Sequence, residues 1–170
     1  MVASGGRWQP RAGQKRGAET GPSPVDRGRA GSKHHLLVDA TGIPLAFSVT
    51  GGNRNDVTQL IPLLDAVPPV HGRRGAPRRR PQRVVADRGY DHDKYRRLVR
   101  ERGITPLIAR RQTTHGSGLG SLRWVVERTF AWLHQFKRLL VRYDRHVEVH
   151  EAFLALGCCL VCFKRLQNSL

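Results

Sequence analysis

The order in which apolar runs and helical patterns follow one another constrains this chain most strongly. Four short runs rich in Val, Leu and Ile have the length of strands, at 34–39, 43–49, 83–87 and 104–109. Apolar spacings typical of helices lie between and after them, at 56–67, 91–103, 122–141 and 149–166. This order of elements predicts a mixed α/β sheet flanked by helices.

The chain before residue 33 has a different character. Residues 1–32 are rich in Gly, Pro, Arg and Ser and show no apolar periodicity. We therefore expect a loose, basic approach segment in front of a folded domain at 33–170. The first helix of that domain is predicted to begin at Asp56, capped by this residue with Gln59 reaching back, and to end before Pro68.

The net charge indicates a polyanion as the partner. Thirty Lys and Arg residues face thirteen Asp and Glu, which gives a formal net charge of +17, and 25 of the thirty are Arg. Because a guanidinium group binds two phosphate oxygens at once, nucleic acid ranks above a membrane surface. The longest apolar run, 152–163, is too short to span a bilayer, and the first residues lack the apolar stretch of a signal peptide. We expect a cytoplasmic protein.

Five arginines crowd into one stretch between the first predicted helix and the third predicted strand. They are Arg73, Arg74, Arg78, Arg79 and Arg80. An exposed basic loop of this kind is either a solvated surface or a contact with the DNA backbone. On a chain with this net charge we favour DNA.

The histidine and cysteine pairs do not favour a metal site. His34 and His35 are neighbours on a predicted strand, so their side chains point to opposite faces. Cys159 and Cys162 form a C-x-x-C motif inside an apolar run, without a second ligand pair at zinc spacing. We expect these cysteines to be reduced core residues.

Two acids are candidates for chemistry. Asp87 follows a buried strand, at the edge where α/β sheets place their ligands, but an Asp at this point also begins turns. Glu127 lies on the long predicted helix, one turn after Arg123, and both an exposed ion pair and a ligand for a hard cation fit this spacing. The residues alone leave these alternatives open.

Three separated motifs together resemble the DDE-type transposases of bacterial insertion sequences. They are the segment from Gly21 to His35, the run Ala86-Asp87-Arg88-Gly89-Tyr90-Asp91, and the spacing Arg123-x-x-x-Glu127. The resemblance extends from about residue 20 to about residue 166. It implies a ribonuclease H-like fold with a mixed sheet, and metal-dependent DNA cleavage and strand transfer at the ends of the element.

The resemblance also implies roles for individual residues. Asp87 matches the second catalytic carboxylate of the family and Glu127 the third, and with a first Asp they hold two Mg²⁺ or Mn²⁺ ions. Arg123 matches a family arginine that orients the glutamate or contacts phosphate. Lys137 and Arg138 lie near a basic position of the family and are candidate phosphate contacts. The implied partner is DNA with terminal inverted repeats, bound by one copy or by a homodimer.

The chain departs from the family pattern at its start. The family's first Asp lies on the first strand, and only Gly5, Gly6 and Arg7 stand near that position here. We therefore expect a truncated catalytic domain whose first strand is absent or incomplete. Two hypotheses follow: a metal-dependent DNA transposase, and a non-catalytic basic protein that binds nucleic acid.

Overall fold

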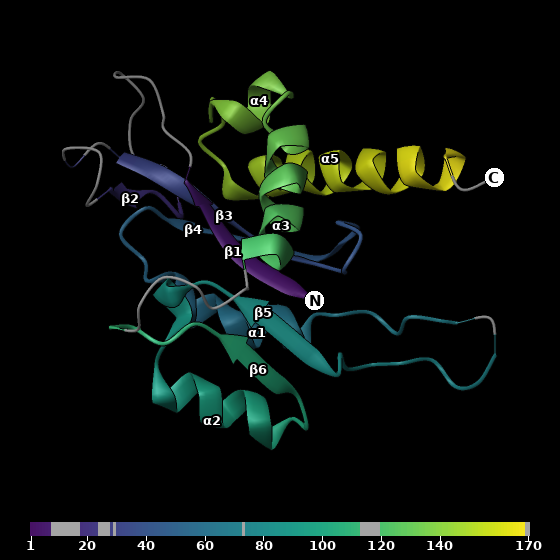
Figure 1. The fold of residues 1–170 in the computed structure, drawn as a ribbon. Helices are drawn as coiled ribbons and strands as arrows, with labels where there is room; N and C mark the ends of the chain where they lie inside the picture. Colours follow the sequence, from purple (N-terminus) through teal and green to yellow (C-terminus); the bar gives the residue numbers. More distant parts are fainter. Residues whose placement is uncertain (8–17, 24–27, 29, 73, 113–119, 169–170) are drawn as a thin grey trace.

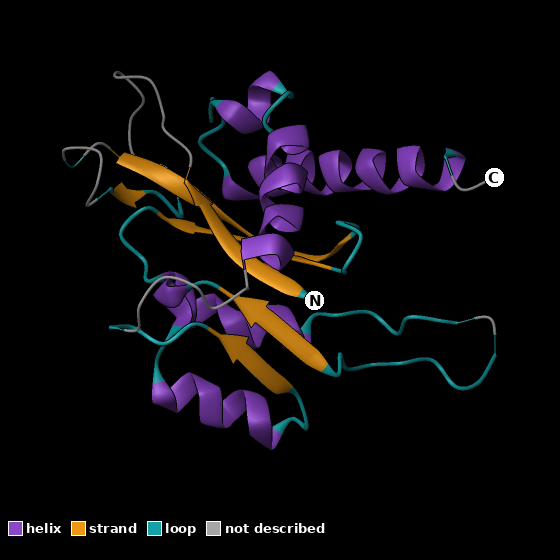
Figure 2. Ribbon diagram, in the orientation of Figure 1, coloured by secondary structure: helices purple, strands orange, loops and turns teal. Residues whose placement is uncertain are grey.

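The computed structural model describes residues 1–7, 18–23, 28, 30–72, 74–112 and 120–168, which form a mixed sheet with helices on both faces (Figures 1 and 2). The predicted fold class is confirmed. The strands are β1 (Val2–Arg7), β2 (Gly21–Pro22), β3 (Ala30–Val38), β4 (Pro44–Gly51), β5 (Arg83–Ala86) and β6 (Thr105–Ile108).

The strand directions agree with the ribonuclease H-like sheet that the resemblance implied. The sheet has the order β2-β3-β1-β5-β6, and β4 pairs with β3. β1 and β4 are both antiparallel to β3, whereas β1, β5 and β6 run parallel to one another. Parallel strands therefore end together at one edge of the sheet, which is where Asp87 follows β5.

The first strand, which we expected to be absent or incomplete, is present as β1. β1 lies in the centre of the sheet and pairs along its whole length with β3. Its first residues also pair with β5, Val2 opposite Val85 and Ala3 opposite Ala86. Small and polar residues gave β1 no apolar alternation, and hydrogen bonds to its neighbours fix it instead. β1, β2 and the start of β3 all lie within the segment 1–32 that we expected to be loose.

The helices divide between the two faces of the sheet. One face carries η1 (Asp56–Gln59), α1 (Leu60–Asp65), η2 (Arg88–Tyr90) and α2 (Asp93–Glu101), and the other carries α3 (Gly120–Leu133), α4 (Lys137–Leu140) and α5 (Val147–Gln167). Figure 1 shows α1 and α2 apart from α3, α4 and α5 across the sheet. Within the described residues, no helix has both the length and the apolar character needed to cross a membrane.

Because successive side chains along a strand point to opposite faces, the sheet has a hydrophobic core on each face. Leu36 and Val85 are buried under α3 and α5, whereas their neighbours Leu37, Val84 and Ala86 are buried against α1 and α2. Successive strand side chains point to opposite faces, so short apolar runs without polar gaps indicate strands covered on both sides. This is why the apolar runs of the sequence predicted β3 and β5.

The predicted cap of the first helix is wrong by one residue. Asn55 caps η1 through its side chain, and Gln59 Oε1 accepts a hydrogen bond from Ser48 Oγ instead of reaching back. Asp56 forms an ion pair with Lys33, its Oδ1 lying 2.8 Å from Lys33 Nζ. Helix capping therefore does not explain this acid.

The long helix predicted over 122–141 is two helices, α3 and α4. Leu133, Phe136 and Leu139 all surround Gly157 of α5, where an added Cβ would lie 2.9 Å from Leu139 Cδ1 and 3.0 Å from Leu133 Cδ2. A continuous helix would place residues 133 and 139 on different faces. The break between the helices lets both leucines reach the same point on α5.

The cysteines are only partly in the core. Cys158 is buried, but Cys159 is exposed and Cys162 is half-buried. The prediction that both residues of the C-x-x-C motif are core residues is wrong for Cys159. All three thiols are free.

A buried guanidinium joins segments that are far apart in the sequence. Arg142, between α4 and α5, is only 2% exposed. It donates a hydrogen bond to Ser32 Oγ of β3 at 2.6 Å. It also donates to the carbonyl oxygens of Ala18, Glu19, Asp144 and Arg145. Such a group is stabilising only while all of these acceptors stay in place.

We expect R142M to lower the free energy of unfolding by about 3 kcal/mol, because buried acceptors lose a charged donor. Urea denaturation followed by circular dichroism measures the change. R145M is the matched control, since Arg145 is exposed and its substitution should change stability by less than about 0.5 kcal/mol. Equal effects of the two variants would contradict the structural role of Arg142.

Histidines form a buried contact on the side of α3 and α5. His34 Nε2 lies 2.7 Å from His150 Nε2 in the core. His35 points to the opposite face, where its Nε2 lies 2.7 Å from Thr50 Oγ1, as predicted for neighbours on a strand. Burial lowers the pKa of His150 to about 4, that of His35 to about 4 and that of His34 well below its usual value.

These lowered pKa values predict that stability falls as the pH drops from about 6.5 towards about 4. In this window the unfolded chain takes up protons on its histidines while the folded chain does not. Each buried histidine should contribute a slope of roughly 1.4 kcal/mol per pH unit. Urea denaturation between pH 7 and pH 5 tests this, with H150Q expected to reduce the slope. A stability independent of pH across this window would contradict the assignment.

Candidate functional site

Asp87 directly follows β5 and caps the next helical turn. Its Oδ1 accepts a hydrogen bond from the Gly89 amide at 2.8 Å, which makes it the N-cap of η2. The interpretation of Asp87 as the start of a turn is therefore confirmed. The charge of Asp87 also reaches the phenol of Tyr90, which belongs to the core on the side of α1 and α2.

The backbone of β1 passes beside Asp87 but carries no acid there. Ala3 is in register with Ala86, so residue 4 of β1 lies level with Asp87. Residue 4 also pairs with Leu36 of β3, so an acid at this position would lie on the strand next to β5, which Asp87 follows. The strand reads Val-Ala-Ser-Gly-Gly-Arg and offers none.

Glu127 lies on the helix that covers this part of the sheet. α3 contacts β1, β3 and β5. Val126, the residue before Glu127, joins Val2 and Val85 in one buried cluster, while the Glu127 side chain is exposed. The second and third acids of the predicted trio therefore come from the end of β5 and from α3, which contact each other.

The donor set does not fit a site made of three carboxylates. Across the described residues, no group of three or more His, Cys, Asp or Glu side chains is arranged to hold a metal ion. Another acid near this edge is Asp56. Burial raises the pKa of Tyr90 well above its usual value, and the charges of Asp56 and Asp87 raise it further, so both acids lie near this phenol. Lys33 already neutralises Asp56.

The structure does not describe the side chains of two predicted site residues. Arg73 is not among the described residues, and Arg123 is described only as part of the backbone of α3. Their contacts with phosphate or with Glu127 stay predictions.

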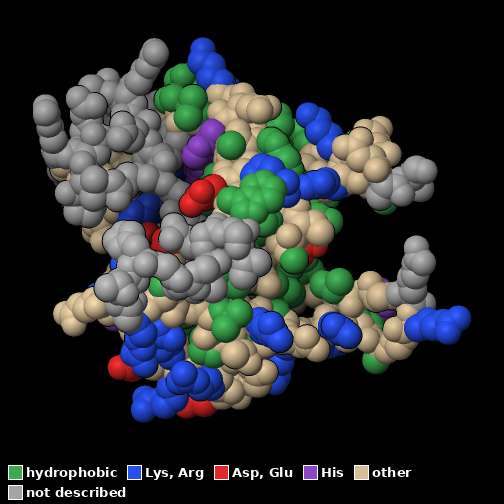
Figure 3. Space-filling model, in the orientation of Figure 1, with side chains coloured by type: hydrophobic (Ala, Val, Ile, Leu, Met, Phe, Trp, Pro, Cys, Tyr) green, Lys and Arg blue, Asp and Glu red, His purple; other side chains and the backbone are tan. Residues whose placement is uncertain are grey.

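The predicted DNA-binding arginines are exposed but lie away from Asp87. The loop between α1 and β5, here called the basic loop, carries the exposed residues Arg74, Arg78, Arg79 and Arg80. It extends away from the sheet (Figure 1), and Figure 3 shows blue Lys or Arg atoms at its tip and further back. The basic loop enters β5 at Arg83, whereas Asp87 follows the other end of this strand, roughly 13 Å away.

Lys137 and Arg138 begin α4, on the side of the sheet that α3 covers. Lys137 is exposed. Arg138 Nη1 forms an ion pair with Asp144 Oδ1 at 3.1 Å, and its guanidinium carbon lies 4.8 Å from the centre of the Phe153 ring. Because Arg138 is engaged within the protein, Lys137 is the better candidate for a phosphate contact.

Sequence reasoning missed two arginines at the edge that carries Asp87. Arg111, which follows β6, donates hydrogen bonds to the carbonyl oxygens of Arg88 and Gly89 at 3.2 and 3.3 Å. Arg110 pairs with Asp93 at 2.7 Å. A signal for this position was present, since the two arginines directly follow an apolar run that pairs in parallel with the strand before Asp87.

Asp91 holds Arg111 at the edge of the sheet where Asp87 lies. Its carboxylate accepts hydrogen bonds from Arg96 Nε and from the Arg111 amide, both at 2.7 Å. Burial alone would raise the pKa of Asp91, but these hydrogen bonds outweigh it and lower the pKa. Asp91 therefore stays charged and fixes Arg111 next to the turn that Asp87 caps.

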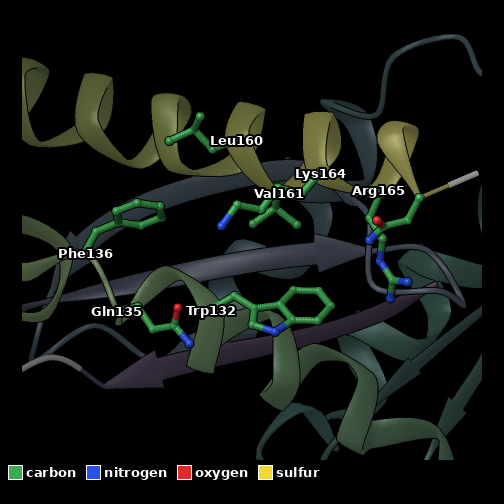
Figure 4. Close-up of a pocket in the computed structure, with 8 residues that line it drawn as sticks. Trp132, Gln135, Phe136, Leu160, Val161, Lys164 and Arg165 are labelled. Atoms are coloured by element: carbon green, nitrogen blue, oxygen red, sulfur yellow. The ribbon is translucent and has the colours of Figure 1, made fainter.

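An arrangement of arginine and tryptophan side chains fastens α3 to the turn between β3 and β4. The guanidinium carbon of Arg128 lies 4.3 Å from the Trp124 ring centre and 4.9 Å from that of Trp132, and Arg165 lies 5.1 Å from Trp132. Both arginines donate to the Thr41 carbonyl oxygen at 2.8 Å. Figure 4 shows Trp132 and Arg165 at a hollow of about 330 Å³ between α3 and α5. These cations have a structural role.

The chain is similar to known transposases over most of its length. A family model for the transposase DDE domain matches residues 7–162. The chain is 60% identical over 151 residues to a protein assigned as a transposase for insertion sequence element IS402 of Burkholderia cepacia, covering 89% of this chain and 72% of the relative. It is 28% identical over 147 residues to the transposase for IS1106 of Neisseria meningitidis serogroup B, covering 80% of this chain and 47% of the relative.

A third relative is assigned as a transposase for IS6501 of Brucella ovis, with 25% identity over 136 residues, covering 76% of this chain and 96% of the relative. No solved structure matches the chain. The family model covers most of the chain, and its match includes β5 with Asp87 and α3 with Glu127. The chain therefore belongs to the family of insertion-sequence transposases with a DDE domain.

Proposed function

We propose that this chain binds the ends of an insertion sequence through the DNA backbone. The basic loop is the contact surface. The observation that supports this most directly is the exposure of the arginines in the basic loop, on a chain with a formal net charge of +17. Arginines bind phosphates in a bidentate geometry, and phosphate contacts account for most of the affinity of such proteins. A DNA partner also agrees with the cytoplasmic location that the sequence predicts.

We further propose that Asp87 and Glu127 are the metal ligands left in this chain, with Arg123 next to the glutamate. Members of this family use divalent metal ions, and carboxylate oxygens suit Mg²⁺ or Mn²⁺. Two carboxylates provide less charge and fewer ligands than three, so binding of the ion should be weak. Because β1 carries no acid level with Asp87, we propose that the chain binds DNA ends without cutting them.

A cleaving transposase is the second candidate. The identity of 60% to the IS402 protein favours it. In that case the chain would nick DNA with terminal inverted repeats in the presence of Mn²⁺ or Mg²⁺, as a homodimer on paired ends. D87N and E127Q would abolish nicking. Absence of nicking by the unaltered chain, together with intact DNA binding, would instead support the binding function.

We expect the combined variant R74Q/R78Q/R79Q/R80Q to bind DNA about tenfold or more weakly, because four phosphate contacts are lost. Fluorescence anisotropy at several salt concentrations measures this. The slope of log affinity against log salt should become about 3 to 4 less steep, at roughly 0.9 for each contact.

The matched control removes the same charge from other surfaces, in R97Q/R100Q/R145Q/K164Q. Equal losses in the two variants would show that net charge alone drives binding and would reject the basic loop as the contact. D87N and E127Q should leave DNA affinity unchanged under either candidate function.

We expect S4D to raise the affinity for Mn²⁺ about tenfold or more, because it places a third acid on β1, level with Asp87 after the neighbouring strand β5. Isothermal titration calorimetry without DNA measures the affinity. S4N is the control of equal size, and S4D/D87N should lose the gain. An affinity of S4D equal to that of S4N would reject the proposed position of the ion.

A further inference from the structure

A hollow lies at the base of the basic loop. Its volume is about 410 Å³, which is within the range of pockets that hold small molecules. The end of α1, both ends of the basic loop and the turn between α2 and β6 line it. Ile104, in this turn, precedes Thr105, which pairs with Arg83 at the start of β5. The hollow is therefore at the opposite end of β5 from Asp87.

The floor of this hollow is apolar. Leu64, Val67 and Ile104 contribute to it, and all three are buried. They belong to the core on the side of α1 and α2, so the floor is fixed by the fold. Pro69 adds an apolar ring that is exposed. An inorganic anion would leave this surface without a partner, whereas a ligand with a flat apolar part would cover it.

The side chains around the hollow carry more positive than negative charge. Asp65 is paired with Arg102, whose Nε and Nη2 donate to its two carboxylate oxygens at 2.8 and 2.9 Å. Arg79 and Arg80 also line the hollow, and neither has a carboxylate at ion-pair distance among the described residues. Two cations are therefore left for a ligand with negative charge. Arginines that converge in this way bind phosphate oxygens.

The base of the basic loop is held in place before any ligand binds. Val70 and Arg78 exchange two backbone hydrogen bonds of 2.9 Å, which close the loop. Arg79 directly follows this bridge, and Arg80 Nη1 donates to the Arg102 carbonyl oxygen at 3.4 Å. A ligand that enters the hollow has to order fewer groups than one that binds the tip of the loop, which favours affinity.

These features fit a nucleotide, which joins a phosphate to a flat base. We propose that the hollow binds one unpaired nucleotide of the DNA, with its phosphate between Arg79 and Arg80 and its base against the apolar floor. The guanidinium plane of Arg102, fixed by Asp65, is available to stack on this base, as arginines do with unstacked bases. A base inside a duplex is stacked and paired, so only an unpaired base can enter the hollow.

This inference rests on the proposed binding of DNA by the basic loop, and it specifies which part of the DNA the base of the loop takes. The hollow lies at the Arg83 end of β5, roughly 13 Å from Asp87. The bound nucleotide is therefore anchored at a distance from the two acids.

Fluorescence anisotropy with two duplexes of equal length tests the proposal. One has paired ends, and the other is frayed because its last two base pairs are mispaired. The unaltered chain should bind the frayed duplex about fivefold more tightly. P69E, which places a carboxylate at the hollow, should lose this preference. P68E is the matched control, since Pro68 is exposed and is not part of the lining, and it should keep the preference.

A second pair of variants removes equal charge from the same loop. R79Q/R80Q and R74Q/R78Q should both weaken binding of the paired duplex, but only R79Q/R80Q should lose the preference for the frayed one. Circular dichroism checks that each variant is folded. Because the preference is a ratio of two affinities, it is separate from the overall DNA affinity that tests the proposed function.

Competition experiments identify the ligand. Free dAMP should displace the frayed duplex at concentrations where inorganic phosphate does not. Equal displacement by both would show a phosphate site without a place for the base and would overturn the proposal. Equal affinity of the unaltered chain for the two duplexes would also overturn it, even if dAMP binds, because the ligand would then be a free nucleotide. A preference that P69E and P68E retain equally would reject the hollow as its location.

Discussion

The backbone hydrogen bonds of β1 hold the two halves of the sheet together. Among the described strands, β1 is the link between β3, with β2 and β4, and the parallel pair β5 and β6. The start of the chain extends this link, because the Met1 ammonium group donates to the Arg83 carbonyl oxygen and the Met1 carbonyl oxygen accepts from the Val85 amide. Both cores draw side chains from both halves, so each core depends on this pairing.

The same strand explains how a transposase fold and an incomplete acid set coexist. Pairing with β3 and β5 uses main-chain groups, which every residue of β1 has, whereas holding an ion needs a particular side chain at one position. Under the proposed function, small residues at that position keep the register without supplying a ligand. Scaffold and chemistry are thus separable in this chain: Asp87 still caps its turn and Glu127 still lies on the helix above, each with a local reason to stay where it is.

The sequence predicted the elements whose pattern reflects burial, and it missed those that depend on distant partners. β3, β5 and α5 are apolar enough to be recognised alone. β1 was missed because its neighbours supply its hydrogen bonds. The break after α3 was missed because the contact of Leu133 and Leu139 with Gly157 joins residues far apart in the sequence. Asp87 was found from its place after a strand, but Arg111 joined it only when the parallel pairing of β5 and β6 was known.

Arg142 has a consequence for the rate at which this protein reaches its native state. Its guanidinium bonds to the carbonyl oxygen of Ala18, 124 residues away, and to Ser32 Oγ, 110 residues away. These contacts stabilise the protein only after very long loops have closed. The pairing of β1 in the centre of the sheet likewise joins residues that are far apart in the sequence. We therefore expect slow folding, with the pairing of β1 and the docking of Arg142 among the last contacts to form.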